Sequence, residues 1–272
     1  MKMKLYAFVC VLGLVAISSS CNKKNDYTSV VEVIREWNFT ISSFNVNAAT
    51  LSTPTTATFH MVVLGDSSLR YDVKLDSSSE TINSLQIKLG DPVTDGALLL
   101  NLPIRIYGTY AYGTLPGVSG SVIASLLDDK TEKYINVSSG NAPNGLVRGQ
   151  LNSEVVLATN VPLSGTSVVP AVNTTTSGTA YIRMTSDKML YSKIVITADD
   201  PTDPVTTATL NKGASGVNGS VIASLVASPT DFGVGKKTTV SAADYATILS
   251  NNTYVIVNSG MNAGGKLRGQ VK

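Results

Sequence analysis

Side chains able to carry out nucleophilic or acid-base chemistry are scarce in this 272-residue chain. His60 is its only histidine, so a Ser-His-Asp or Cys-His site would have to be built around that one residue. It lies in the run from Phe59 to Leu64, which alternates as a strand does, and a single histidine on a strand belongs to the surface or to packing. We therefore expect no catalytic residues and no enzymatic activity.

Three aspartates, Asp199, Asp200 and Asp203, could together offer oxygen ligands to a calcium ion. Pro201 and Pro204 are interleaved with them, and this composition is typical of a turn. EF-hand spacing is absent, and no glycine stands where such a loop needs one. We prefer the interpretation as a turn, and we expect neither a metal nor another cofactor.

Two sets of side chains could bind a ligand without transforming it. Tyr107, Tyr110 and Tyr112 form an aromatic cluster, in which Tyr110 and Tyr112 share one face of a strand. If exposed, these rings suit a protein or glycan contact, and if buried they are core; the sequence leaves both open. Arg148 and Arg268, each in an Arg-Gly-Gln run, could clamp a carboxylate or phosphate. The alternating pattern around them favours a structural role, in which the arginine lies across a neighbouring strand.

The N-terminus has the build of an export signal. Lys2 and Lys4 precede a 13-residue apolar run, Leu5–Ile17, which small residues connect to Cys21. As a helix the run would rise only about 20 Å, short of the roughly 30 Å hydrocarbon core, so a permanent transmembrane helix is disfavoured. Ser18–Ser20 before the cysteine resemble the lipobox of bacterial lipoproteins, in which the cysteine is lipidated. The alternative is an ordinary signal peptidase that leaves Cys21 as a free thiol.

Removal of the signal also sets the charge and redox properties of the mature chain. Cys10 would be lost with the signal, so the mature domains can form no internal disulfide. Without Lys2 and Lys4 the side chains number 19 basic against 19 acidic, with no long basic cluster, and we expect no nucleic-acid partner. We expect an exported protein anchored to a bacterial membrane through Cys21, at the outer membrane or the cell surface.

An internal repeat organises the rest of the chain. The segments Gly117–Leu126 (GVSGSVIASL) and Gly216–Leu225 (GVNGSVIASL) agree at nine of ten positions, 99 residues apart. Arg148-Gly149-Gln150 recurs as Arg268-Gly269-Gln270 at an offset of 120. The difference between the offsets predicts that copy two has 21 more residues between its motifs. A helix from Ser241, its N-cap, to Leu249 is predicted inside that stretch.

Strand signals recur in both copies. Leu69, Tyr71, Val73 and Leu75 alternate with polar residues, and Ala180, Ile182 and Met184 do the same in copy two. We predict an all-β fold of two tandem antiparallel β-sandwich domains, with one short helix in the second. The predicted segments are a signal peptide and lipobox (1–21), a tether (22–36), a divergent first β domain (37–152) and a second (153–272).

Copy two resembles the CHRD domain, named for chordin and also found in bacterial exported proteins. The resemblance rests on Val161–Gly165, Gly178-Thr179-Ala180, Gly213–Gly219, the helix Ser241–Leu249 and Gly264–Gln270. It implies a sandwich related to copper-zinc superoxide dismutase or to immunoglobulin domains, and a binding role rather than a reaction.

The resemblance also bears on metal binding. Members of the family often carry a His-x-His pair and a later histidine, where this chain has Thr209, Asn211 and Asn258. In copy one the positions matched at the same offsets are Tyr110, Tyr112 and Ser138. None of these is a good zinc or copper ligand, although such polar groups could line a ligand groove.

These observations predict a lipid-anchored cell-envelope protein with two CHRD-like domains that act as a non-enzymatic binding or interaction module. The partners would be the membrane, through lipidated Cys21, and an unidentified protein or glycan ligand. Two alternatives remain: a metal-binding or enzymatic protein on a superoxide-dismutase-like fold, and a purely structural envelope protein.

Overall fold

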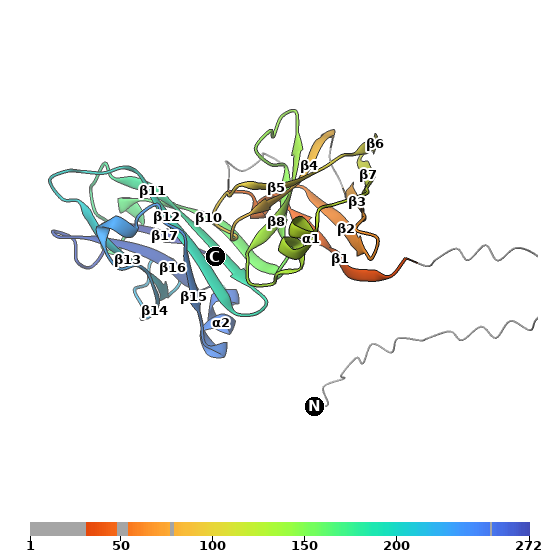
Figure 1. The fold of residues 1–272 in the computed structure, drawn as a ribbon. Helices are drawn as coiled ribbons and strands as arrows, with labels where there is room; N and C mark the ends of the chain where they lie inside the picture. Colours follow the sequence, from red (N-terminus) through yellow and green to blue (C-terminus); the bar gives the residue numbers. More distant parts are fainter. Residues whose placement is uncertain (1–30, 48–53, 77–78, 251) are drawn as a thin grey trace, which may run out of the picture. The chain divides into compact units, whose positions relative to one another are not determined.

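The computed structural model of the chain describes residues 31–47, 54–76, 79–250 and 252–272. Antiparallel strands dominate this part of the chain, as the sequence predicts (Figure 1). We refer to residues 31–152 as the first half and to residues 153–272 as the second half. The predicted signal and Cys21 lie outside the described residues.

The first half contains β1 (Val33–Ser42), η1 (Ser43–Asn45), β2 (Thr56–Leu64), β3 (Leu69–Leu75), β4 (Ile82–Leu89), β5 (Leu98–Leu102), β6 (Arg105–Tyr107), β7 (Tyr110–Leu115), α1 (Gly120–Leu127), β8 (Lys133–Ser139) and β9 (Val147–Gln150). The second half contains β10 (Val155–Leu163), η2 (Gly165–Ser167), β11 (Ser177–Thr185), β12 (Met189–Ala198), β13 (Val205–Lys212), β14 (Val221–Val226), η3 (Pro229–Asp231), β15 (Lys236–Thr239), α2 (Ala242–Leu249), β16 (Thr253–Ser259) and β17 (Leu267–Gln270).

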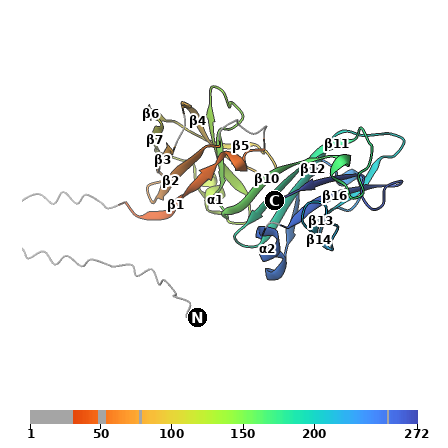
Figure 2. The same ribbon diagram turned by 180° about the vertical axis from the view of Figure 1, so that it is seen from behind.

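The two halves pair their strands in the same order. In the second half one sheet runs β10-β11-β12-β15 and the other β14-β13-β16-β17, and an isolated bridge between Ser164 and Arg268 connects them. The first half has the order β5-β4-β8-β9-β1-β2-β3-β7-β6, in which Ser42 paired with Arg148 makes the matching connection between β1 and β9. Seen from behind, β1 and β2 of this sheet can be followed in Figure 2.

The apolar cores follow from side-chain alternation along these strands. In β3 the apolar residues at alternate positions from Leu69 to Leu75 are buried, while the residues between them are less covered. The buried core of the first half draws its members from Trp37 to Leu151, and that of the second half from Leu157 to Val271. Each core cluster is therefore built from one half only.

Helix α2 forms where the sequence predicts it. The Ser241 hydroxyl accepts a hydrogen bond from the Asp244 amide, 3.1 Å away, and so caps the helix. Ile248 is fully buried and joins the second-half core, which fixes the helix against the strands.

The structure also has a helix that was not predicted from the sequence, α1 in the first half. The segment SVIASL occurs twice, as the helical residues 121–126 and within residues 220–225, where strand β14 forms. Ser119 caps α1 by accepting from the Val122 amide, and Leu126 is buried beneath it. In the second half the same sequence forms β14, which pairs with β13 instead. Tertiary context, rather than the local sequence, decides between the two conformations.

The true structural counterparts therefore lie at offsets of 120 to 124, and the offset of 99 has no structural meaning. Helix α1 corresponds to α2, because each follows the strand paired with β3 or β12 and each has a serine N-cap. Strand β5 corresponds to β14, since each is the edge partner of its sheet. The expectation that copy two alone contains this helical stretch was wrong.

Candidate functional site

The tyrosine cluster lies on the outer face of the first-half sheet. Tyr110 and Tyr112 project from the same side of β7 and stack with ring centroids 5.4 Å apart and an interplanar angle of 24°. Tyr112 is 41% exposed, and Tyr107 on the edge strand β6 is 82% exposed. Of the two arrangements that the sequence left open, the structure has the exposed one.

His60 lies on the same face, between two carboxylates. Its Nδ1 is 3.1 Å from Asp72 Oδ1 on β3, and its Nε2 is 2.9 Å from Glu36 Oε1 on β1. Burial alone lowers the pKa of His60, but the hydrogen bonds and charges of Asp72 and Glu36 outweigh it and raise that pKa above 6.5. Only the doubly protonated imidazolium can donate to both carboxylates at once.

Two hollows flank Tyr112. One, of about 410 Å³, is lined by residues that include His60, Arg70, Asp72 and Tyr110, together with Tyr112 itself. The other, of about 480 Å³, is lined by Pro103–Arg105 and by Tyr112–Thr114. Because Tyr112 and Gly113 line both, the ring of Tyr112 forms a ridge between two adjoining depressions.

Four members of this face were not predicted from the sequence: Glu36, Arg70, Asp72 and Arg105. Strand pairing brings them together, since Asp72 lies opposite both His60 and Tyr112, and Arg105 lies opposite Tyr112 on its other side. Strand alternation could have placed each of them on an outward face. Which strands are neighbours was not readable from the sequence.

The two repeated arginines are buried, and their guanidinium groups already have partners within the fold. Arg148 and Arg268 are each 1% exposed, and their guanidinium carbons lie 3.4 Å and 3.6 Å from the ring centroids of Tyr134 and Tyr254. Each guanidinium donates to two backbone carbonyls of a glycine-bounded loop, residues 90–96 or 213–219. These contacts support the structural role, in which the arginine holds the loop against the sheet.

The side chain at the end of each of these loops completes the contact. Asp95 Oδ1 accepts from Arg148 at 2.6 Å, and Asn218 Oδ1 accepts from Arg268 at 3.1 Å. The loops correspond at an offset of 123, so the counterpart of the Gly213 loop begins at Gly90.

Asn211 and Asn258 of the predicted ligand-binding set lie in the second half and do not contact each other directly. Asn211 accepts from Thr209 Oγ1 at 2.6 Å and donates to the Gly219 carbonyl, whereas Asn258 donates to Thr207 Oγ1 at 3.2 Å. By strand order, β4 is the counterpart of β13, so Tyr110 and Tyr112 on β7 are not the equivalents of Thr209 and Asn211.

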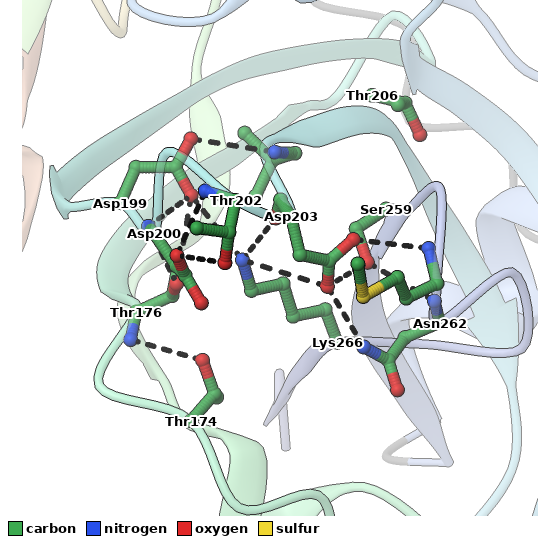
Figure 3. Close-up of polar contacts among 12 residues, drawn as sticks. Thr174, Thr176, Asp199, Asp200, Thr202, Asp203, Thr206, Ser259, Asn262 and Lys266 are labelled. Carbon is green, nitrogen blue, oxygen red and sulfur yellow. Dashed lines mark hydrogen bonds and ion pairs between the residues drawn. The ribbon is translucent and has the colours of Figure 1, made fainter.

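The aspartate turn surrounds a buried lysine (Figure 3). Lys266, with a 1% exposed side chain, donates to the backbone carbonyl of Asp203 and lies 3.4 Å from Asp199 Oδ1 and 3.8 Å from Asp203 Oδ2. Its ammonium group therefore supplies the positive charge that a metal ion would bring to this cluster. Asp200 accepts from both the amide and the hydroxyl of Thr202, as a turn-forming aspartate does.

Asp203 is held as a carboxylate by several donors. The Met261 amide, the Ser259 hydroxyl and the Asn262 side chain donate to it at 2.9, 2.7 and 2.9 Å. These hydrogen bonds, that of the Met261 amide above all, lower the pKa of Asp203 below its ordinary value. The cluster is thus an ion-paired and hydrogen-bonded connection between the β12–β13 turn and the β16–β17 loop.

Across the described ranges, no three His, Cys, Asp or Glu side chains are grouped as metal ligands. Nor does any helix in those ranges have the length and apolar character needed to cross a membrane.

The fold belongs to the all-β class and is sandwich-like, with antiparallel sheets in each half. Residues 159–271 match the CHRD domain, so the second half contains a CHRD domain, as the sequence resemblance predicts. None of the curated proteins and none of the solved structures compared with the chain matches it.

Proposed function

We propose that the chain is a lipid-anchored protein of the bacterial cell envelope whose two CHRD-like domains form a non-enzymatic binding module. A CHRD domain suggests binding or interaction rather than a reaction. The observation that carries the proposal for this chain is the exposed tyrosine face of the first half, with Tyr107 82% exposed beside the ridge of Tyr112. Exposed tyrosines provide a large contact area at a small cost in conformational entropy.

The first half is proposed as a second, divergent CHRD-like domain. Support comes from the shared strand order, from α1 as the counterpart of α2, and from the arginine that clamps a glycine-bounded loop in each half. The boundary near residues 151–154 stays a prediction.

Binding by the tyrosine face is tested with the purified mature chain against a panel of polysaccharides and envelope proteins. We expect Tyr107→Ala combined with Tyr112→Ala to abolish binding, and Tyr181→Ala on β11 of the second half to leave it unchanged. Equal binding by all variants would contradict the proposed surface. Catalytic turnover by the metal-free mature chain would favour the enzymatic alternative instead, and failure to bind any member of the panel would favour a purely structural role.

Lipid anchoring is tested at Cys21, where the apolar run, the small residues and the cysteine count converge. We expect Cys21→Ala to move the protein from the membrane fraction to the soluble fraction, and the wild-type mature chain to carry the mass of attached acyl chains. Membrane retention of the variant, with no acyl mass on the wild type, would exclude the anchor.

A further inference from the structure

The charged groups around Tyr112 point to the chemistry of a ligand. Arg105 on β6 lies directly opposite Tyr112, and Arg70 lies on β3, at the position paired with Thr114. Both arginines are exposed, and each lines one of the two hollows that flank Tyr112. Among the described residues, neither guanidinium forms a hydrogen bond or an ion pair. The ridge therefore has on each side a guanidinium without a hydrogen bond among the described residues, and that of Arg70 also feels the charge of Asp66.

Acceptors lie beside these donors. His60 engages one oxygen of Glu36 and one oxygen of Asp72, and no hydrogen bond is formed by the second oxygen of either carboxylate among the described residues. The face thus offers guanidinium donors for anions, carboxylate acceptors for hydroxyl groups, and flat aromatic rings for the C–H faces of a sugar.

We propose that this face binds an acidic polysaccharide, with one sugar ring on Tyr112 and carboxylate-bearing rings reaching Arg70 and Arg105. This inference rests on the proposed binding function and specifies its ligand class. Strand spacing places the backbones of the two arginines on the order of 10 Å apart, on either side of β7, so a chain rather than a single sugar fits both. An acidic peptide also brings carboxylates and backbone N–H donors, but it has no sugar-ring C–H face to lie on Tyr112.

The test measures binding of the full mature chain to three probes: oligogalacturonate, its methyl ester and polyglutamate. We expect oligogalacturonate to bind about tenfold more tightly than the ester, which has no charge for the guanidinium groups. Added salt should weaken this preference. Arg70→Gln and Arg105→Gln should each reduce the preference, and Tyr112→Ala should weaken binding of both sugars. Lys212→Gln removes an exposed positive charge from the second half and serves as the matched control.

Each other outcome overturns the inference in a distinguishable way. Equal affinity for the acid and the ester would identify a neutral-glycan site, which leaves the proposed binding function intact. Polyglutamate binding as tight as oligogalacturonate, with the same loss in the arginine variants, would identify an acidic-peptide site. Absence of binding to all three probes, together with no effect of Tyr112→Ala in the wider panel, would remove both the inference and the proposed surface.

Discussion

At the scale of single residues, the contribution of His60 to folding stability depends on pH. A group whose pKa is raised on folding adds stability that is fully present below its unfolded pKa and is lost as pH rises through the folded pKa. The pKa of His60 is raised above 6.5, so its contribution is complete in mildly acidic solution and disappears at alkaline pH. Glu36 and Asp72 are the carboxylates responsible, and Arg70 and Tyr110 line the same hollow.

We therefore expect His60→Gln to lower the free energy of unfolding more at pH 5 than at pH 8. Denaturant titrations of both proteins at the two pH values measure this difference. His60→Gln in a chain that also carries Glu36→Gln and Asp72→Asn is the control, because the pH-dependent difference should vanish there. A loss of stability that is the same at both pH values would show that the imidazolium is not paired as described.

Lys266 is a second residue with a large expected effect. Removing one member of a buried ion pair leaves the other charge uncompensated, at a cost of about 3 kcal/mol. The first half has Leu146 at the corresponding position, so Lys266→Leu is a change that the architecture accepts sterically. We expect a loss of this size in thermal or denaturant unfolding. A variant as stable as the wild type would show that the ammonium group contributes no net stability.

At the scale of elements, the glycine-bounded loops show how little space the repeated motif allows. A Cβ at Gly219 would overlap the backbone carbonyl of Lys212, and one at Gly96 would overlap that of Leu89. Either loop would have to move away from the sheet and weaken the arginine contact that holds it.

We expect Gly219→Ala to destabilise the protein by about 1–3 kcal/mol, as overpacking in a tight site does. Gly260→Ala is the matched control, because a Cβ there meets no atom and the backbone is not in the left-handed region. Urea unfolding of the two variants makes the comparison. Equal stability of both variants would show that the Gly219 loop accepts a Cβ without cost, contrary to the close approach of the Lys212 carbonyl.

At the scale of the whole molecule, the question is whether each half folds alone. In the second half, every strand pairing given for the described residues and every member of the core lies within residues 155–271. Some contacts do cross between the halves, since Glu132 accepts from both the Tyr191 hydroxyl and Lys237, at 2.6 and 2.7 Å. A fragment should therefore fold, but with less stability than the same segment has in the full chain.

We expect residues 153–272 to unfold in one cooperative transition, at a lower temperature than the second half within residues 22–272. Calorimetry of the two proteins measures both transitions, and Glu132→Gln in the longer chain should shift its transition towards that of the fragment. A fragment that is soluble only with residues 37–152 attached would show that the halves are not independent.

The sequence alone determined the properties that repeat locally. Alternation marked strands such as Leu69–Leu75, and a serine cap with an apolar stripe marked α2, because side-chain periodicity and capping act over a few residues. The CHRD pattern in residues 159–271 was also readable, because its glycines and its Arg-Gly-Gln run stand at characteristic positions.

The tertiary structure decided what depends on partners distant in the sequence. The segment SVIASL forms a helix that follows β7 in one half and a strand paired with β13 in the other, because its tertiary neighbours, rather than its sequence, decide between the two conformations. His60 gained its carboxylates and Tyr112 its flanking arginines through strand pairing, which brings together residues from β1, β2, β3, β6 and β7. Burial of Arg148 likewise depends on a loop more than fifty residues earlier in the chain, to which it donates its hydrogen bonds.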